Sequence, residues 1–196
     1  LILLTWFSQL ILFGVSKKTI FFLLLLSLII IILAYVALDH VRFRIDNYFQ
    51  PTTGDNYQVH KSIDSFTNGG FFGQGLGAGE VSHNLPDVYS DFILSLAAEE
   101  LGLISVLIVV TLYSFIFYRS IYHSTRKNDI FYFLSISGLA IIFILQTMIN
   151  IFSTLNLIPT KGMTLPFLSY GGSSLISCAI LIGFILSLSK IKYEKV

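Results

Sequence analysis

The chain has 196 residues, of which 55% are hydrophobic and 12% charged, and its formal net charge at pH 7 is +1. A soluble domain of this length could not bury so much apolar surface, so the composition indicates a polytopic membrane protein. The single cysteine, Cys178, excludes a disulfide framework and a cysteine metal site.

Five apolar runs are predicted to cross the membrane as helices, since most of them approach the roughly 20 residues that span a bilayer core. They cover residues 1–15, 19–38, 101–118, 130–151 and 173–188. A long loop at 39–90 and a re-entrant-like loop at 152–172 connect them. We therefore expect an all-α fold forming one membrane domain over 1–196. Because the chain opens on an apolar run with no Met and no basic segment, we interpret it as the later part of a longer protein.

The charged residues divide between the two sides of these spans. Eight of the twelve basic residues fall on flanks that share one side: Lys17, Lys18, Arg119, Arg126, Lys127, Lys190, Lys192 and Lys195. The positive-inside rule places that side in the cytoplasm. Nine of the eleven acidic residues lie between the second and third spans, on the exoplasmic side. We interpret the basic flanks as topology signals, and expect no nucleic-acid partner.

The loop at 39–90 is too long for a simple helix connection, and such loops are usually functional or disordered. It keeps apolar and aromatic residues throughout, so we expect it to fold against the membrane or its own helices. Within it, TGDNYQVHKSIDSF at 53–66 predicts a short amphipathic helix capped by Thr53 or Asp55.

The segment 68–102, NGGFFGQGLGAGEVSHNLPDVYSDFILSLAAEELG, combines glycines with carboxylates. Its glycines allow main-chain amides to face an anionic group. Asp91 lies between a predicted turn and an apolar helical stretch, a pattern typical of a helix cap. An ionisable residue at a membrane boundary is also a functional candidate, so both interpretations stay open. Glu99 and Glu100 follow two turns later and should approach the same membrane face.

A second unusual stretch, LIPTKGMTLPFLSYGGSS at 157–174, lies on the same predicted side. Its prolines and glycines break helix continuity at membrane depth, where irregular backbone survives only against protein or a watery cavity. We therefore expect it to line a cavity. In the preceding span, Gln146 and Asn150 share a helix face, which favours either an interhelical hydrogen bond or a polar cavity wall.

These two motifs together resemble the SEDS family of polytopic peptidoglycan polymerases, and the match covers residues 42–174. The PTKG form and the GDNYQV segment are most similar to the cell-division member of that family. The resemblance implies a ten-helix fold, of which this chain would be approximately the last five helices. It also implies a location in the bacterial inner membrane at the division septum, with the large loop exoplasmic.

The activity implied by the resemblance is a glycosyltransferase that polymerises lipid II, an undecaprenyl-diphosphate-linked disaccharide pentapeptide, into glycan strands. The family's essential aspartate sits in a His-Thr-Asp-Phe motif that falls here on Tyr89-Ser90-Asp91-Phe92, which implies that Asp91 is the general base. Tyr89 replaces the histidine, so a mechanism that needs a histidine there is not supported. The implied partner is a class B penicillin-binding protein, with other division proteins.

The departing diphosphate requires positive charge. The available exoplasmic cations are Arg42, Arg44, Lys61 and Lys161; the alternative is a divalent cation, Mg²⁺ or Mn²⁺, held in part by Asp91 or Glu80. With Glu80 and these cations, the expected substrate-binding residues are Ser169, Gly171 and Gly172.

Two other functions fit the same pattern. Broken helices and an acidic loop also suit a lipid II flippase or transporter that forms no bond. A noncatalytic scaffold for division proteins is the third interpretation.

Overall fold

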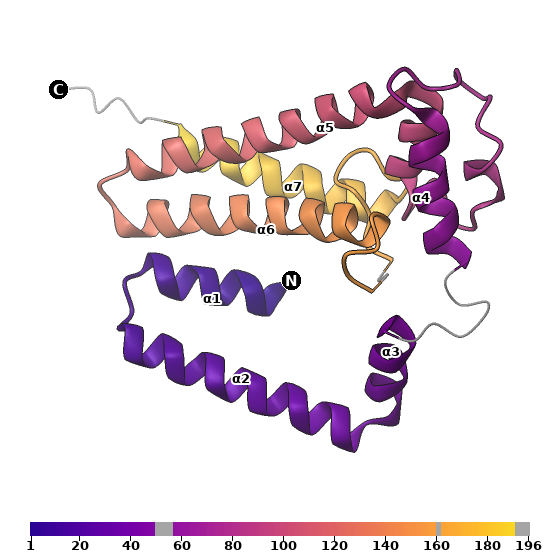
Figure 1. The fold of residues 1–196 in the computed structure, drawn as a ribbon. Coiled ribbons are helices and arrows are strands. Elements are labelled where there is room, and N and C mark those ends of the chain that lie inside the picture. The colour runs from indigo at the N-terminus through magenta and orange to yellow at the C-terminus, as the bar shows by residue number, and fades with distance from the viewer. Residues whose placement is uncertain (50–56, 160–161, 191–196) are drawn as a thin grey trace.

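The computed structural model describes residues 1–49, 57–159 and 162–190, and within these ranges all regular structure is helical (Figure 1). The elements are α1 (Ile2–Leu12), α2 (Lys17–Ala37), α3 (Asp39–Phe49), α4 (Tyr57–Gly69), the 3-10 helix η1 (Ser82–Asn84), α5 (Ile93–Thr125), α6 (Ile130–Thr154) and α7 (Gly172–Ser189). The predicted all-α fold is confirmed.

Four described helices, α2, α5, α6 and α7, are long and apolar enough to cross a membrane. The first of the five predicted runs forms α1, which is apolar but has only 11 residues, fewer than the roughly 20 that a bilayer core requires. The third run, predicted at 101–118, belongs to a longer helix, since α5 extends from Ile93 to Thr125. The chain is therefore a multi-pass α-helical membrane protein.

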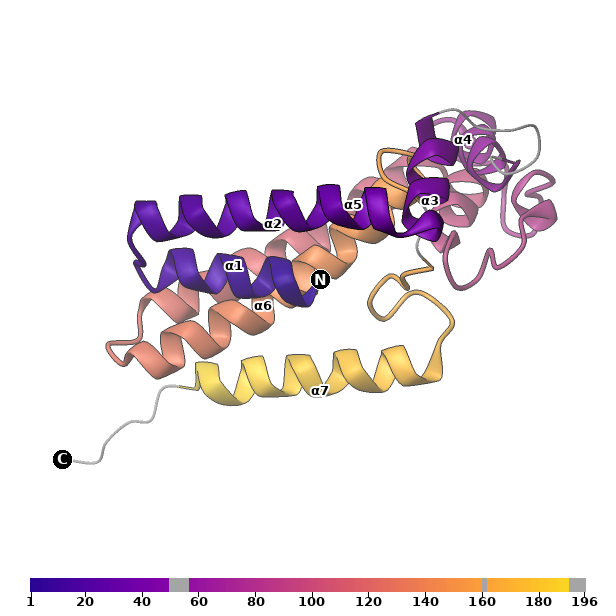
Figure 2. The ribbon, with the colours of Figure 1, turned by 90° about the horizontal axis from the view of Figure 1, so that it is seen from below.

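α1, α5, α6 and α7 form a bundle with two different ends, whereas α2 contacts α3 (Figures 1 and 2). α6 contacts α5, α7 and α1. The α1–α2 link, the α5–α6 link and the C-terminal end of α7 lie at one end, where the Lys127 ammonium donates a hydrogen bond to the Lys190 carbonyl at 2.8 Å. α3, α4 and η1 lie at the other end, together with the irregular segments 70–81, 85–92, 155–159 and 162–171. The described parts of the basic flanks and of the acidic loop thus lie at opposite ends of the molecule.

Polar side chains begin the helices at the basic end. Ser16 Oγ accepts a hydrogen bond from the Thr19 amide at 3.3 Å at the start of α2. Asp129 Oδ1 accepts from the Phe131 amide at 2.8 Å at the start of α6. Both residues satisfy amide groups that a helix leaves without a partner in its first turn.

The predicted loop at 39–90 contains α3, α4 and η1. The amphipathic helix predicted at 53–66 corresponds to α4, whose described part runs from Tyr57 to Gly69 and packs on α5. Its proposed caps, Thr53 and Asp55, lie outside the described residues.

A break in α5 organises this end of the molecule. Gly102 has φ 81° and ψ 174° in the middle of the helix, a conformation that is essentially restricted to glycine. Two helical hydrogen bonds are interrupted at the break, so the amides of Leu103 and Ile104 and the carbonyls of Glu99 and Glu100 need other partners.

The loop at 70–75 supplies a partner for each of these four groups. The Leu103 amide donates to the Gly70 carbonyl at 2.9 Å, the Ile104 amide to the Phe71 carbonyl at 3.4 Å, the Gln74 amide to the Glu99 carbonyl at 2.9 Å and the Gly75 amide to the Glu100 carbonyl at 2.9 Å. The glycine-rich loop therefore fits into the break and completes the hydrogen bonding of α5.

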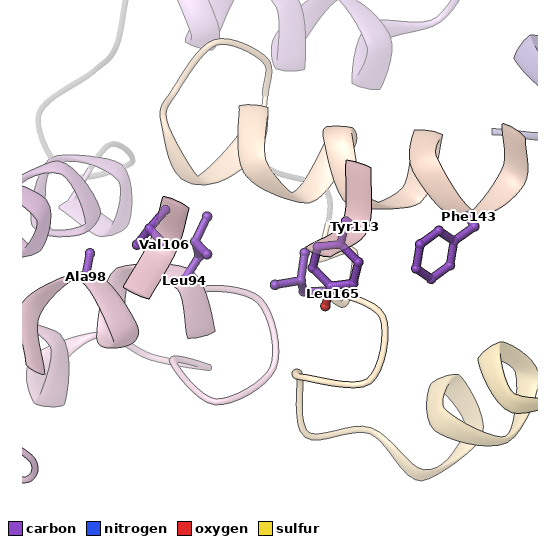
Figure 3. Packing of buried hydrophobic residues seen from close by; sticks show 6 residues of the cluster. All are labelled: Leu94, Ala98, Val106, Tyr113, Phe143 and Leu165. Atoms are coloured by element: carbon purple, nitrogen blue, oxygen red, sulfur yellow. The ribbon is translucent and has the colours of Figure 1, made fainter. Parts of the chain in front are cut away.

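An apolar cluster joins α5 and α6 to residues 162–171, which precede α7 (Figure 3). It consists of Leu94, Ala98, Val106, Tyr113, Phe143 and Leu165. The ring centroids of Tyr113 and Phe143 are 5.5 Å apart. The Tyr113 hydroxyl donates a hydrogen bond to the Pro166 carbonyl. The irregular segment before α7 is thereby fixed to the bundle.

Substitution of Gly102 by alanine should destabilise the whole protein. A Cβ at this position would lie 2.3 Å from the Phe71 carbonyl oxygen and 2.5 Å from the Gly73 amide nitrogen. The unfavourable backbone conformation alone costs about 1–3 kcal/mol. We expect Gly102→Ala to lower the melting temperature of the full-length protein in detergent by several degrees. Gly183→Ala is the control, since Gly183 lies inside α7 with open space around it; equal melting temperatures for the two variants would contradict the proposed role of the break.

Candidate functional site

Glu99 is the central side chain of the glycine-rich segment. It is fully buried, and its Oε1 accepts hydrogen bonds from Asn68 Nδ2 at 2.8 Å and from the Val81 amide at 3.0 Å. Its Oε2 accepts from the Ser82 amide at 2.7 Å. These bonds satisfy a buried carboxylate that would otherwise be costly, and they attach both α4 and η1 to α5.

The three carboxylates that were predicted to approach one membrane face have different surroundings. Glu99 is enclosed by the loop that it holds. Glu100 faces His83, with 3.8 Å between Glu100 Oε1 and His83 Nε2. Asp91 lies eight residues before Glu99 in the chain, outside α5.

The prediction that Asp91 caps a helix is wrong. The N-cap of α5 is Phe92, and no side chain caps it. Asp91 belongs to the preceding turn, where its amide donates to the Asp87 carbonyl at 2.9 Å. The residue pattern before the apolar helix suggested a cap. Asp91, however, lies one residue before the N-cap position, so its carboxylate is not placed to accept from the first amides of α5. The Asp91 carboxylate therefore has no capping role at this helix.

Asn150 holds the Asp91 turn against the second irregular segment. From α6, its Nδ2 donates to the Asp91 carbonyl at 3.0 Å and to the Met163 carbonyl at 2.6 Å. Gln146, one turn earlier, donates to the Thr164 carbonyl at 3.0 Å. The two polar residues thus share a helix face, as predicted, and they bind the backbone of the loops.

Two further contacts bring the loops together. The Tyr170 amide donates to the Tyr89 carbonyl at 2.8 Å. A Cβ added at Gly162 would lie 3.1 Å from Asp91 Oδ2, so the backbone passes close to the carboxylate. Since Gly162 also has φ 58°, a side chain here would be strained and would contact Asp91. The motifs that were linked only by sequence interpretation are therefore neighbours in the fold.

Of the other predicted site residues, three lie in or beside this second segment. Ser169 is buried, and its Oγ accepts from the Leu165 amide at 2.8 Å, so this hydroxyl supports the turn. Gly171 is the N-cap of α7 and Gly172 is its first residue. The structure thus places these residues on the segment that adjoins Asp91.

The predicted cations are more widely distributed. Arg42 lies on α3, with 3.6 Å between its Nε and Asp46 Oδ2. Lys61 is half-buried on α4. Lys161 and the side chain of Arg44 lie outside the described residues. Which cation faces a diphosphate stays a prediction.

Glu80 is exposed on the glycine-rich loop, and its carbonyl accepts from Asn84 Nδ2 at 2.8 Å. Over residues 1–49, 57–159 and 162–190, no three His, Cys, Asp or Glu side chains lie close enough together to hold a metal ion. A cation bound through Asp91 or Glu80 would therefore need further oxygen ligands from a substrate.

The surroundings of Asp91 favour its protonated form. Burial raises the pKa of this carboxyl, and the neighbouring Asp87 carboxylate raises it further, while a hydrogen bond from Ser90 acts in the opposite direction. A carboxyl whose pKa is shifted by burial and by a neighbouring charge is a candidate for a functional residue.

Sequence interpretation missed the structural roles of Glu99 and Gly102. Both belong to the Glu-Glu-Leu-Gly sequence at 99–102, where two carboxylates and a glycine interrupt an apolar helix. That interruption was a usable signal for a break, although its partners are about 30 residues earlier in the chain.

The fold and this end of the molecule define a multi-pass membrane protein in which a glycine-rich loop and a broken segment meet at an aspartate. The family model described as "Cell cycle protein", for FtsW, RodA and SpoVE, matches residues 1–194. The chain belongs to this family, and the resemblance to the SEDS proteins is confirmed.

Its curated homologues are named as peptidoglycan glycosyltransferases. The chain is 40% identical over 154 residues to a probable peptidoglycan glycosyltransferase FtsW of Caulobacter vibrioides, covering 79% of this chain and 40% of that protein. A similarly named FtsW of Buchnera aphidicola is 39% identical over 181 residues, covering 88% and 51%. Peptidoglycan glycosyltransferase RodA of Mycobacterium bovis is 35% identical over 161 residues, covering 81% and 34%. The chain thus spans about half, or less, of the length of these relatives.

Two solved structures are similar in fold. A chain from a structure described as "Structural coordination of polymerization and crosslinking by a peptidoglycan synthase complex" has a TM-score of 0.76 at 23% identity, covering 98% of this chain and 55% of that chain. A mutant of the rod shape determining protein RodA from Thermus thermophilus has a TM-score of 0.51 at 31% identity, covering 54% and 36%.

The three hydrogen bonds of Glu99 lead to a test of the loop. Glu99→Gln keeps the shape of the side chain but replaces one accepting oxygen with an NH₂ group, which faces a backbone amide that also donates. We therefore expect the free energy of unfolding to fall by about 2–3 kcal/mol. Hydrogen exchange at the Val81 and Ser82 amides of the full-length protein should become faster. Glu100→Gln is the matched control, because Glu100 has only the 3.8 Å contact with His83. Unchanged exchange in Glu99→Gln would show that this carboxylate does not hold η1.

Proposed function

We propose that this chain is part of a peptidoglycan glycosyltransferase that polymerises lipid II during septal cell-wall synthesis, with Asp91 as general base. The observation that carries the proposal is the position of the Asp91 carboxylate, which lies beside Gly162 with a raised pKa. The names of the curated homologues support the reaction class. Because the chain spans only part of those proteins, the active unit is the longer protein.

In the proposed reaction, a sugar hydroxyl of one lipid-linked unit attacks the anomeric carbon of another. Asp91 takes the hydroxyl proton as the new carbon–oxygen bond forms. The bond to the diphosphate breaks, and its electron pair leaves with the diphosphate. A single displacement inverts the anomeric configuration, giving a β-linked glycan from an α-linked donor, and it needs no second carboxylate nucleophile.

The neighbours of Asp91 would determine where its carboxylate stands during this step. Asn150 binds the carbonyl of Asp91 itself and that of Met163, so it would keep the turn and the facing segment at a constant separation. Since general base catalysis requires the carboxylate within hydrogen-bond reach of the hydroxyl, this separation matters for rate.

The charge of the departing diphosphate would be met by the exoplasmic cations, Arg42, Arg44, Lys61 and Lys161, or by a divalent cation. Mg²⁺ and Mn²⁺ favour carboxylate, water and phosphate oxygens. Asp91 or Glu80 would supply one ligand and the substrate the phosphate oxygens. Glu80, Ser169, Gly171 and Gly172 stay the proposed lining of the substrate site.

The proposed location is the bacterial inner membrane at the septum, with the Asp91 end exoplasmic. Support comes from Lys17, Lys18, Arg126, Lys127 and Lys190, which lie on the helix ends and links at the opposite end of the bundle, as the positive-inside rule requires. The septal role rests on the resemblance of the PTKG and GDNYQV segments to the cell-division member of the family. A class B penicillin-binding protein is the proposed partner.

Loss of the Asp91 carboxylate should abolish polymerisation. With the full-length protein, its transpeptidase partner and labelled lipid II, we expect Asp91→Asn to reduce glycan synthesis about 100-fold or more. Asp64→Asn, an exposed carboxylate on α4, is the control and should keep wild-type activity. Glycan formation by Asp91→Asn at the wild-type rate would remove this residue from the mechanism. Lipid movement without glycan from the wild type would favour a flippase, and neither activity would favour a scaffold.

The raised pKa of Asp91 gives a pH dependence with a definite sign. The general base must be ionised, so the polymerisation rate should fall as the pH drops through the pKa of Asp91. Because Asp87 contributes to raising that pKa, Asp87→Asn should lower it and extend activity to lower pH. The acid limb of the rate profile measures this change. A shift in the opposite direction would contradict the assignment.

A further inference from the structure

Three large apolar side chains project from the loop that completes α5. Phe71 is 68% exposed, Phe72 84% and Leu76 79%. We refer to residues 71–76 as the loop tip. Exposure of this much aromatic and apolar surface on one short segment is unfavourable in water and indicates an interaction site.

The hydrogen bonds at the break determine the level of the loop tip along α5. The Phe71 carbonyl accepts from the Ile104 amide, and the Gly75 amide donates to the Glu100 carbonyl. The loop tip therefore lies beside the turn around Gly102 and cannot move along the helix without breaking these bonds.

That level coincides with the end of an apolar stretch. From Leu101 to Tyr118 the helix carries no charged residue, and it is bounded by Glu100 and Arg119. At a rise of 1.5 Å per residue this stretch is about 27 Å long, close to the roughly 30 Å of a bilayer hydrocarbon core. Where this stretch spans the hydrocarbon core, the loop tip is level with the boundary between the hydrocarbon and headgroup regions.

The exposed surface continues from the loop tip along the helix. A shallow groove on α5 is lined by Ile104, Leu107, Ile108, Thr111 and Leu112. It begins beside the loop tip, since the Ile104 amide donates a hydrogen bond to the Phe71 carbonyl. Its leucines and isoleucines are exposed, as expected of a lipid-facing surface. Exposed Phe and Leu side chains at the end of such a surface are typical of segments that bury an apolar face in the membrane interface.

We propose that the loop tip inserts Phe71, Phe72 and Leu76 into the membrane interface, where bulk phospholipid covers them. The glycine-rich loop is then held from two sides, by the break in α5 and by the lipid. The interaction does not depend on the reaction proposed above, and the chemistry that recognises it is the acyl-chain boundary of a phospholipid.

Tryptophan fluorescence of the full-length protein in vesicles tests this proposal. Phe72→Trp should add emission that phospholipids brominated near the headgroup end of their acyl chains quench about two-fold, and that aqueous iodide leaves largely unchanged. The signal is the difference from the parent protein in the same vesicles. His60→Trp, at an exposed position on α4, is the control and should respond to iodide instead.

Two outcomes would overturn the proposal. Quenching of Phe72→Trp by iodide but not by brominated lipid would place the loop tip in water. Quenching by neither would mean that another protein segment covers it. Because both substitutions are at exposed positions, melting temperatures close to that of the parent protein will show that the fold is retained.

Discussion

The fold of this chain depends on the need to satisfy backbone groups where a membrane helix is interrupted. Unpaired amides and carbonyls are costly where water is scarce, and α5 leaves four of them at Gly102. The loop at 70–75 pairs with all four. One glycine of this loop has a steric cause, since a Cβ on Gly73 would lie 2.2 Å from the Glu100 carbonyl oxygen. Gly70 and Gly75 have open space around them, and their positive φ angles of 57° and 109° favour glycine instead. A break in one helix thus determines the path of a loop distant in sequence.

Two polar side chains extend this arrangement to the candidate site. The Glu99 carboxylate holds the backbone at Val81 and Ser82. The segment that begins there reaches Asp91 nine residues after Ser82. Asn150 then attaches the Asp91 turn to the segment that precedes α7. Neither residue needs to contact a substrate. Both are buried, so their hydrogen bonds are protected from water and contribute more than surface contacts would.

The sequence predicted the class of fold and most of the helices, because long apolar runs have few alternatives to a membrane helix. The resemblance assigned Asp91, which local pattern alone interpreted as a cap. The break at Gly102 could not be predicted in the same way, since its stability depends on hydrogen bonds to residues about 30 positions earlier. The burial of Glu99 was missed for the same reason: a Glu-Glu pair before an apolar run looks solvent-facing until its partners, Asn68 and Ser82, are known.

The hydrogen bonds between the two irregular segments have a consequence for substrate exchange. The Tyr170–Tyr89 bond and the two donations from Asn150 join both sides of the Asp91 turn into one rigid wall. Moving these segments apart would break three hydrogen bonds together, of which the two from Asn150 are partly buried. We therefore expect the wall to stay fixed through each cycle, while entry and release are controlled by whatever lies opposite it.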